Sequence, residues 1–180
     1  MEITAYLGLG SNLGDREANL REARRRIGQI ARISRASSIY ETEPVGLANQ
    51  PWFLNQVIET KLLSDSENAT VLGAARFLAQ LLAIEIEIGR ERSVINGPRV
   101  IDIDLLFYGS AIITHSRATD CSGDVDIVVP HPRLHLRRFV LEPICEIAPD
   151  LFHPVLKKSC KEILELLDDD SRVTFYSEAE

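Results

Sequence analysis

Three stretches of the chain have the hydrophobic and polar pattern of strands. Residues 3–9 are predicted to be a short buried strand, and residues 32–42 and 53–63 are predicted to be the second and third strands. Residues 53–63 divide into two faces: Leu54, Ile58 and Leu62 on one, and Phe53, Asn55 and Val57 on the other.

A helical period of three to four residues marks three other stretches. It predicts helices over residues 15–30, 69–88 and 158–168. Asn12 and Asp15 are both candidates to cap the first helix, since their side chains can accept from free amides. Gly89 directly follows the second helix, at the position of a C-terminal glycine cap.

Polar and turn-forming residues separate these elements. The loop 43–52 is long for a compact domain, and loops of that length are commonly functional. Residues 116–126 read as a polar surface insertion, and residues 169–180 as a solvated tail. The order strand, helix, strand, strand, helix, strand predicts one α+β domain over residues 1–180, a ferredoxin-like split βαβ sandwich whose antiparallel-rich sheet has flanking helices.

The stretch "GPRVIDIDLLFYG" (97–109) has the composition of a buried strand, yet it carries Asp102 and Asp104. Alternation places both carboxylates on one face with Leu106, and it places Phe107 with the apolar residues of the core face. Two like charges so close repel each other, and burial increases that cost. A divalent cation would offset the repulsion, and Mg²⁺ is commonly held by one or two carboxylates plus substrate phosphates. A strand at the sheet edge with one solvated face is the structural alternative.

Composition narrows the classes of partner. The net charge of −7 argues against a general nucleic-acid surface, because such surfaces are basic. Three cysteines without metal-type spacing favour a reducing compartment. The start of the chain lacks the pattern of a signal peptide, and no apolar run reaches the ~18 residues of a membrane span. We therefore expect a cytoplasmic protein that binds neither nucleic acid nor membrane.

Arginines cluster near the two aspartates, which points to a specific anion. Arg90 and Arg92 follow the second helix and Arg99 precedes Asp102 by three residues. Guanidinium groups suit polyphosphate oxygens, although positive charge at a helix C-terminus also has a purely structural explanation. Alternation turns Arg99 away from Asp102, so we expect it to reach around the start of the strand and not to form a simple ion pair with Asp102. Carboxylates and arginines together are the recurring parts of phosphoryl transfer.

Two familiar phosphate-binding loops are excluded. "GLGSNLG" (8–14) does not match G-x-G-x-x-G because Leu13 occupies the third glycine position, and no P-loop motif occurs in the chain. The segment is predicted to be a tight strand-to-helix turn.

Aromatic and amide side chains suggest a site for a flat heterocycle. Phe53 and Asn55 share one strand face and Phe139 comes later, so stacking could combine with edge hydrogen bonds, although core packing is the usual role of a single aromatic residue. His131 lies between two prolines in "VPHPR", where a directed contact is plausible.

Most of the chain resembles the 6-hydroxymethyl-7,8-dihydropterin pyrophosphokinases of folate biosynthesis. The resemblance rests on these segments, in the order of the family: "YLGLGSNLGD", "YETEPVG", "QPWFLNQV", "GPRVIDIDLLFYG" and "VPHPRLHLRRFVLEPICEIAPDLFHP". It implies a ferredoxin-like domain in which the pterin hydroxymethyl oxygen attacks the β-phosphorus of ATP, giving AMP and the pterin diphosphate. ATP is then a co-substrate. No general base is evident, so metal-assisted deprotonation and alignment would carry the rate.

The resemblance also implies residue roles. Asp102 and Asp104 would hold two Mg²⁺ ions and form the catalytic set with Arg90 and Arg99. The nucleotide contacts would come from Glu85, Arg90, Arg92, Arg99, His131 and Arg137. The pterin would lie between Phe53 and Phe139, with Thr42 and Asn55 bonded to its edge and Val45 contributing from the loop.

Some positions depart from the family pattern. Phe53 replaces a tyrosine that is often found there, and Asn96 stands where many members have a tryptophan. The insertion 116–126 looks longer than usual, and whether it contacts another folate enzyme stays open.

Two rival functions remain from the residues. A D-x-D phosphatase would use Asp102 as its nucleophile, but such pairs lie near the chain start, with Thr or Val at the position that Leu106 occupies here. A non-catalytic ferredoxin-like module would bind a small ligand without needing arginines beside the aspartates. Mg²⁺-dependent formation of AMP distinguishes both from the pyrophosphokinase.

Overall fold

The computed structural model describes the chain except residues 1, 47–48, 64–70, 92–96, 121–122 and 179–180, and for residues 63 and 115–125 nothing is described of the side chains. Its main sheet has the strand order β10-β3-β4-β1-β5, with β2 also paired to β4, and every pairing is antiparallel. The strands are β1 (Glu2–Ser11), β2 (Arg32–Ala36), β3 (Ile39–Thr42), β4 (Phe53–Leu63), β5 (Asp102–Tyr108) and β10 (Val173–Ser177). The predicted α+β class and antiparallel sheet are confirmed.

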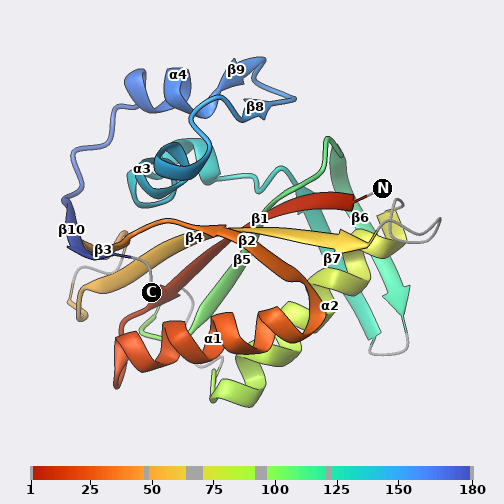
Figure 1. Cartoon of the computed structure of the whole chain (residues 1–180), viewed down its shortest axis with the longest axis horizontal. Helices are drawn as coiled ribbons and strands as arrows, with labels where there is room; N and C mark the ends of the chain where they lie inside the picture. Colours follow the sequence, from red (N-terminus) through yellow and green to blue (C-terminus); the bar gives the residue numbers. More distant parts are fainter. Residues whose placement is uncertain (1, 47–48, 64–70, 92–96, 121–122, 179–180) are drawn as a thin grey trace.

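Helices cover both faces of this sheet (Figure 1). On one face α1 (Arg16–Ile30) and α2 (Val71–Ile88) pack on a core that includes Leu7, Leu54 and Ile103. On the other face α3 (Arg138–Ile147) and α4 (Cys160–Glu165) pack on a second core that includes Tyr6 and Val57. The two-face prediction for residues 53–63 is therefore confirmed.

Local chemistry sets the helix ends. The Asp15 carboxylate accepts from the Ala18 amide at 3.0 Å, so Asp15 rather than Asn12 caps α1. Gly89 ends α2 at φ 108°, a backbone conformation that costs a residue with a Cβ, as its predicted cap role requires. The last helix is shorter than expected, because Ser159 caps it at Cys160 and Lys158–Ser159 forms the strand β9, which pairs with β8 (Phe152–His153).

The predicted strand 32–42 is two strands. Ser37 interrupts the ladder: its amide donates to the Val57 carbonyl, and its hydroxyl accepts from the Val57 amide at 3.0 Å. The side chain replaces a backbone acceptor here, so β2 and β3 pair separately with β4.

The predicted alternation of β5 fails beyond Leu105. Tyr6 pairs with Phe107 and Leu7 with Leu105, so Leu106 is an extra residue in the ladder. Such a bulge reverses the facing of the residues beyond it. Phe107 consequently packs with Leu106 in the second core instead of the face of Ile103 and Leu105.

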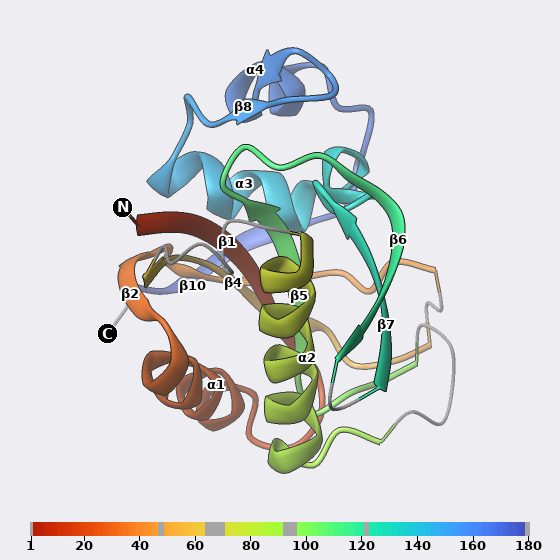
Figure 2. The same cartoon turned by 90° about the vertical axis from the view of Figure 1, so that its right-hand side faces the viewer.

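Two segments predicted to be irregular form strands. Residues 116–120 and 123–126 belong to the paired strands β6 (Ile113–Asp120) and β7 (Gly123–Val129), which pack beside α2 (Figure 2). Residues 173–177, predicted to be tail, add β10 to the sheet edge beside β3. The polar composition of both segments gave no strand prediction, since an edge or hairpin strand needs little apolar surface.

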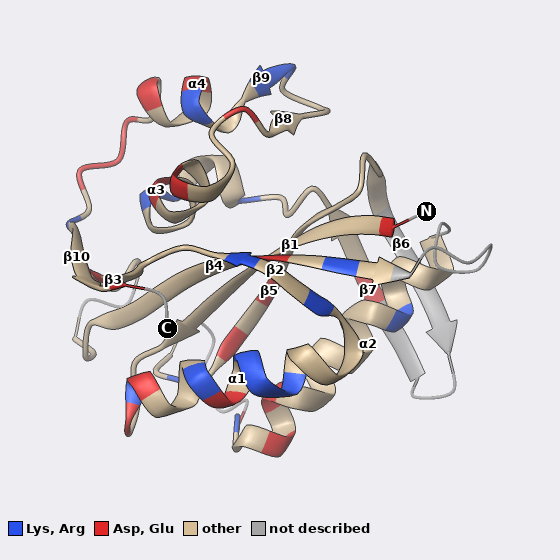
Figure 3. Ribbon diagram, viewed as in Figure 1, with Lys and Arg blue, Asp and Glu red and all other residues tan. Residues whose placement is uncertain are grey.

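Charges of both signs share the surface of α1 (Figure 3). Among the described residues, no helix is long and apolar enough to cross a membrane.

Candidate active site

A pocket of about 860 Å³ opens over the sheet at β1, β4 and β5. Its walls come from the loop after β3, the end of α2, β7, and the segment that runs from His131 through the 3-10 helix η1 (Leu134–Leu136) into α3. This volume is in the range of small-molecule sites.

Two glycines of β1 form the pocket floor. Gly10 pairs with Asn55 on one side and Asp102 on the other, and Gly8 pairs in the same way with Val57 and Asp104. A Cβ on Gly10 would lie 2.7 Å from Asn55 Oδ1, closer than real contacts allow. The central strand therefore leaves open the space between an amide on β4 and a carboxylate on β5. Sequence reasoning missed this role, although glycines two apart in a strand necessarily share a face.

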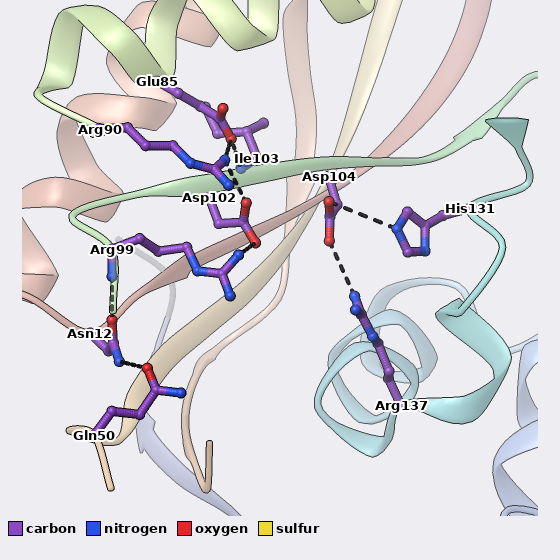
Figure 4. Close-up of polar contacts among 10 residues, drawn as sticks. All are labelled: Asn12, Gln50, Glu85, Arg90, Arg99, Asp102, Ile103, Asp104, His131 and Arg137. Carbon is purple, nitrogen blue, oxygen red and sulfur yellow. Dashed lines mark hydrogen bonds and ion pairs between the residues drawn. The ribbon is translucent and has the colours of Figure 1, made fainter. Parts of the chain in front are cut away.

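The two aspartates reach the pocket side by side on β5 (Figure 4). Asp102 contacts Arg90 at 2.6 Å and Arg99 at 2.8 Å. Asp104 contacts Arg137 at 3.4 Å and lies 3.9 Å from the His131 Nε2. Burial and the neighbouring Asp104 carboxylate raise the pKa of Asp102, against the opposing effect of the arginines. Both carboxylates keep exposed surface, 21% and 32% of their side chains, so a ligand can reach them.

The expectation that Arg99 avoids an ion pair with Asp102 is wrong. Residues 97–101 are not part of β5, which begins at Asp102, so strand alternation does not govern the direction of Arg99. The Asn12 side chain instead fixes this segment, as its Oδ1 accepts from the Arg99 amide at 2.7 Å.

Each of two arginines joins a carboxylate to an aromatic ring. The Arg99 guanidinium lies 5.5 Å from the centroid of Phe53, and that of Arg137 lies 5.4 Å from the centroid of Phe139. These are cation–π distances. The charged part of the pocket and its aromatic part are therefore contiguous, as a ligand with a phosphate chain and a flat ring requires.

The amide and hydroxyl predicted to bond a pterin edge are adjacent and buried. Asn55 Nδ2 donates to Thr42 Oγ1 at 2.6 Å, and the two residues are 8% and 1% exposed. Val45, on the loop after β3, lines the same pocket and is exposed. The structure thus brings together all five residues predicted for the pterin, including both phenylalanines.

Glu85, near the end of α2, is a buried acid, and the cation of Arg90 lies beside it. Glu85 accepts from the Ile103 amide at 2.6 Å and pairs with Arg90. Burial raises the pKa of Glu85 to about 7, although Arg90 opposes the shift. Burial and the neighbouring Arg137 and Arg133 lower the pKa of His131 to about 4, so this imidazole is neutral at physiological pH.

Asn12 is a further site residue that the sequence did not reveal. It is 2% exposed; besides its contact with Arg99, its Nδ2 donates to Gln50 Oε1 at 3.1 Å and to the Pro51 carbonyl at 3.0 Å (Figure 4). The sequence predicts only a possible cap role for Asn12, because a single sequence does not show which distant segments meet. Arg92 and Asn96 lie outside the described residues, so the role expected of Arg92 stays a prediction.

The donor set fits a hard cation that is shared with a substrate. Asp102 and Asp104 offer oxygen ligands, and the described part of the chain contains no group of three or more His, Cys, Asp or Glu side chains suited to a metal. Two carboxylates cannot complete a coordination shell, so phosphate oxygens and water would have to supply the remainder.

Comparison with known proteins identifies the family. The profile of 7,8-dihydro-6-hydroxymethylpterin-pyrophosphokinase (HPPK) matches residues 6–149. A 2-amino-4-hydroxy-6-hydroxymethyldihydropteridine pyrophosphokinase of Aquifex aeolicus is 36% identical over 159 residues, which span 88% of this chain and 89% of that protein. Its counterpart in Bacillus subtilis is 40% identical over 149 residues, spanning 82% and 79%.

A solved structure titled "Crystal Structure Analysis of the HPPK-DHPS in complex with substrates" shares the fold, with a TM-score of 0.69 at 14% identity. The match covers 92% of this chain and 43% of that longer one. By profile, relatives and fold, the chain belongs to the 7,8-dihydro-6-hydroxymethylpterin-pyrophosphokinase family.

Proposed function

We propose that the pocket over β1, β4 and β5 transfers diphosphate from ATP to 6-hydroxymethyl-7,8-dihydropterin, a step of folate biosynthesis. The hydroxymethyl oxygen forms a bond to the β-phosphorus, the bond from that phosphorus to the α-phosphate oxygen breaks, and AMP leaves. The hydroxymethyl proton is released. The observation that carries this function is that charged and aromatic side chains are contiguous in one pocket of a chain of this family, namely Asp102, Asp104, Arg90, Arg99, Arg137, Phe53 and Phe139.

The pterin subsite lies at the β4 side of the pocket. Phe53 and Phe139 stack on the two faces of the ring, while Asn55 and Thr42 bond its edge. Their mutual hydrogen bond supports this assignment, because it holds the amide in one orientation before the ligand arrives. Val45 closes the subsite from the loop after β3.

The nucleotide subsite lies between β5, α2 and η1. Arg90, Arg99 and Arg137 neutralise phosphate oxygens and align the chain for in-line attack. Glu85 and neutral His131 supply hydrogen-bonding groups to the nucleotide. Arg92 is proposed to join them on the family resemblance alone.

Asp102 and Asp104 are proposed to hold two Mg²⁺ ions, which their donor chemistry and accessibility support. When bound, the metal neutralises phosphate charge and acidifies the hydroxymethyl group. Arg90 and Arg99 orient the Asp102 carboxylate from two directions, and Arg137 approaches that of Asp104. These contacts fix the carboxylates before a cation arrives.

We also infer a wider setting for this reaction. The order β1-α1-β2/β3-β4-α2-β5 supports a ferredoxin-like split βαβ core within one domain of residues 1–180. Free Cys145 and Cys160 support a reducing, cytoplasmic environment. The net charge supports small substrates rather than nucleic acid or membrane. The longer HPPK-DHPS chain makes another folate enzyme a reasonable contact to test.

The test mixes the protein with ATP, Mg²⁺ and 6-hydroxymethyl-7,8-dihydropterin and separates the nucleotides. We expect AMP only when the pterin is present. ADP would indicate an ordinary kinase, and a phosphorylated Asp102 would indicate the phosphatase chemistry. No pterin-dependent product would indicate a binding module.

The same assay tests the aspartates. Asp102→Asn and Asp104→Asn are each expected to reduce kcat at least about 100-fold, because each replaces a charged metal ligand with a neutral one. Circular dichroism should show that both variants are folded. Asp150→Asn, an exposed acid outside the pocket, is the control and should keep full activity. Near-normal Mg²⁺-dependent turnover by either aspartate variant would refute the metal assignment.

A further inference from the structure

The C-terminal segment 169–177 contacts both sides of the pocket although it lies beyond the residues that the family profile matches. It descends from α4 to the sheet edge, where β10 pairs with β3 (Figure 1). We propose that this segment, the C-terminal strap, holds the two aromatic walls of the pterin subsite in place, with Asp169 and Arg172 as positioning residues. The inference rests on the proposed function for its effect on catalysis.

Asp169 secures the wall that carries Phe139. Arg137 at the start of α3 makes no side-chain cap. The Asp169 carboxylate instead accepts from the Arg138 amide at 2.9 Å, and its carbonyl accepts from the Arg138 Nε at 2.8 Å. Although burial opposes it, hydrogen bonds from the amides of Arg138 and Ser171 lower the pKa of Asp169, so the cap is charged at neutral pH. The residue it anchors lies directly between Arg137 and Phe139.

Arg172 secures the other wall, formed by the loop that ends at Phe53. Its guanidinium contacts Glu43 Oε1 at 3.1 Å and lies 5.0 Å from the centroid of the Trp52 ring. The backbones of Arg172 and Glu43 are joined as well, since the Glu43 amide donates to the Arg172 carbonyl at 3.1 Å. One residue of the strap therefore contacts the loop at its first residue and at the residue before Phe53.

The contacts of Arg172 act on the pterin side of the pocket and not on its nucleotide side. Glu43, Val45 and Gln50 of the loop line the pocket, and Trp52 immediately precedes the ring that we propose to stack on the pterin. Asp102 and Asp104 belong to β5 and Arg90 follows α2, and no described contact joins these three residues to the strap. Loosening the Arg172 contacts should accordingly weaken pterin binding while leaving ATP binding largely unchanged.

The first test compares Arg172→Ala with Tyr176→Phe. Both change the strap, but the described hydrogen bond of the Tyr176 hydroxyl goes to Glu17 on α1 and not to the loop. Arg172→Ala is expected to raise KM for the pterin roughly three- to tenfold, the scale of an exposed ion pair plus a cation–π contact. KM for ATP should change less than about twofold. Tyr176→Phe should change neither constant.

A double-mutant cycle separates positioning from general destabilisation. If Arg172 acts through Glu43, then Glu43→Gln and Arg172→Ala should each raise the pterin KM, and the double variant should be no worse than the more impaired single variant. Asp169→Ala should raise the pterin KM independently, through α3. The proposal would be overturned if the effects of Glu43→Gln and Arg172→Ala on the pterin KM were multiplicative. It would also be overturned if Arg172→Ala raised the KM values for the pterin and for ATP equally.

Amide hydrogen exchange tests the strap without any turnover. Residues 43–46 and 49–53 should exchange faster in Arg172→Ala than in the unaltered chain, while β5 stays unchanged. If the unaltered protein makes no pterin-dependent AMP, the proposed function fails, yet exchange still decides whether the strap positions the loop. Unchanged exchange over these residues would refute it.

Discussion

At the scale of single residues, the pocket depends on the absence of a side chain at Gly10 of β1 as much as on the side chains that β4 and β5 contribute. Gly10 lies between Asn55 and Asp102, and a methyl group there would displace the Asn55 amide. We expect Gly10→Ala to raise KM for the pterin roughly three- to tenfold, the equivalent of one lost hydrogen bond. Steady-state kinetics with both substrates varied would measure it.

Gly8 provides the matched control. A Cβ there would lie 3.6 Å from the Leu106 side chain, which is an ordinary contact. Gly8→Ala should therefore keep its pterin KM within about twofold of the unaltered value. Equal effects of the two substitutions would show that the close approach to Asn55 is not what requires glycine at position 10.

The charged residues of the site could be predicted from the sequence, whereas their partners could not. Asp102, Asp104 and the arginines stand out because like charges in an apolar strand need an explanation. Asn12 does not stand out, because a buried asparagine and a helix cap have the same appearance in a sequence. Its contacts to Gln50 and Arg99 join residues 38 and 87 positions away, and no local pattern encodes such distances.

At the scale of elements, the local pattern predicted the helices α1 and α2 and the strands β1, β4 and β5, but it missed the irregular positions. The hydroxyl of Ser37 splits one predicted strand into β2 and β3, and the bulge at Leu106 turns Phe107 to the other face. Both depend on pairing with a neighbouring strand, which one strand's own pattern cannot contain. The bulge lies just beyond the aspartates, so the pocket face was still predicted correctly.

Asn12 links three elements, namely the end of β1, the loop before β4 and the segment before β5. Asn12→Asp keeps an acceptor for the Arg99 amide but loses both donors to Gln50 and Pro51. It should raise the pterin KM severalfold with a smaller effect on kcat. Asn12→Ala loses the acceptor for the Arg99 amide as well as the two hydrogen bonds to the loop, so it should both raise the pterin KM and lower kcat.

Asn19→Ala is the control for this substitution. Asn19 bonds Ser11 and Leu13 in the same turn and does not contact the loop or Arg99 in any described bond. Thermal unfolding of all three variants would separate positioning from stability. If Asn12→Asp matched Asn19→Ala in both kinetic constants, the proposed link between β1 and the loop would be wrong.

The β8–β9 turn contains a pH-sensitive residue away from the site. His153 is 4% exposed, and its Nδ1 accepts from the Leu156 amide at 3.2 Å. Burial, with a contribution from His135, lowers the pKa of His153 below the ordinary histidine value of about 6.5. The unfolded chain therefore binds an extra proton as pH falls below about 6.5, and the free energy of unfolding decreases there.

Urea unfolding between pH 7.5 and 5 would measure this effect. His153→Asn keeps an acceptor but has no proton to gain, so its stability should fall less steeply below about pH 6.5 than that of the unaltered chain. Carboxylates contribute equally to both proteins and cancel in the difference. Parallel curves would mean that protonation of His153 does not oppose folding.

At the scale of the whole molecule, the sheet divides two cores, and the pocket opens where its central strands reach the face of α3. The order of elements was enough to predict the antiparallel sheet with helices on it. The hairpin β6–β7 and the edge strand β10 were not predicted, because their polar sequences carry no strong period. These two additions nevertheless matter for the site, since Ile127 and Val129 of β7 line the pocket and β10 is the last part of the strap.

Ligand-dependent stability would test how the charges of the whole site act together. Asp102 and Asp104 repel each other and also repel phosphates, while their arginines are already engaged. ATP alone should therefore bind weakly, and Mg²⁺ alone has only two carboxylates to bind. When Mg²⁺ and ATP are both present, the charge of the metal offsets the charges of the carboxylates and of the phosphates. At 100-fold excess over Kd, Mg²⁺ with ATP should stabilise the fold by about 2.7 kcal/mol, which raises Tm by about 5–10 °C.

Differential scanning calorimetry with each ligand separately and combined would measure these shifts. Chelating Mg²⁺ with EDTA should remove most of the stabilisation by ATP, and Asp102→Asn should abolish the synergy because it removes one of the two carboxylates. A Tm shift with ATP alone as large as with Mg²⁺ and ATP would mean that the arginines, and not a metal on β5, provide the binding energy for the nucleotide.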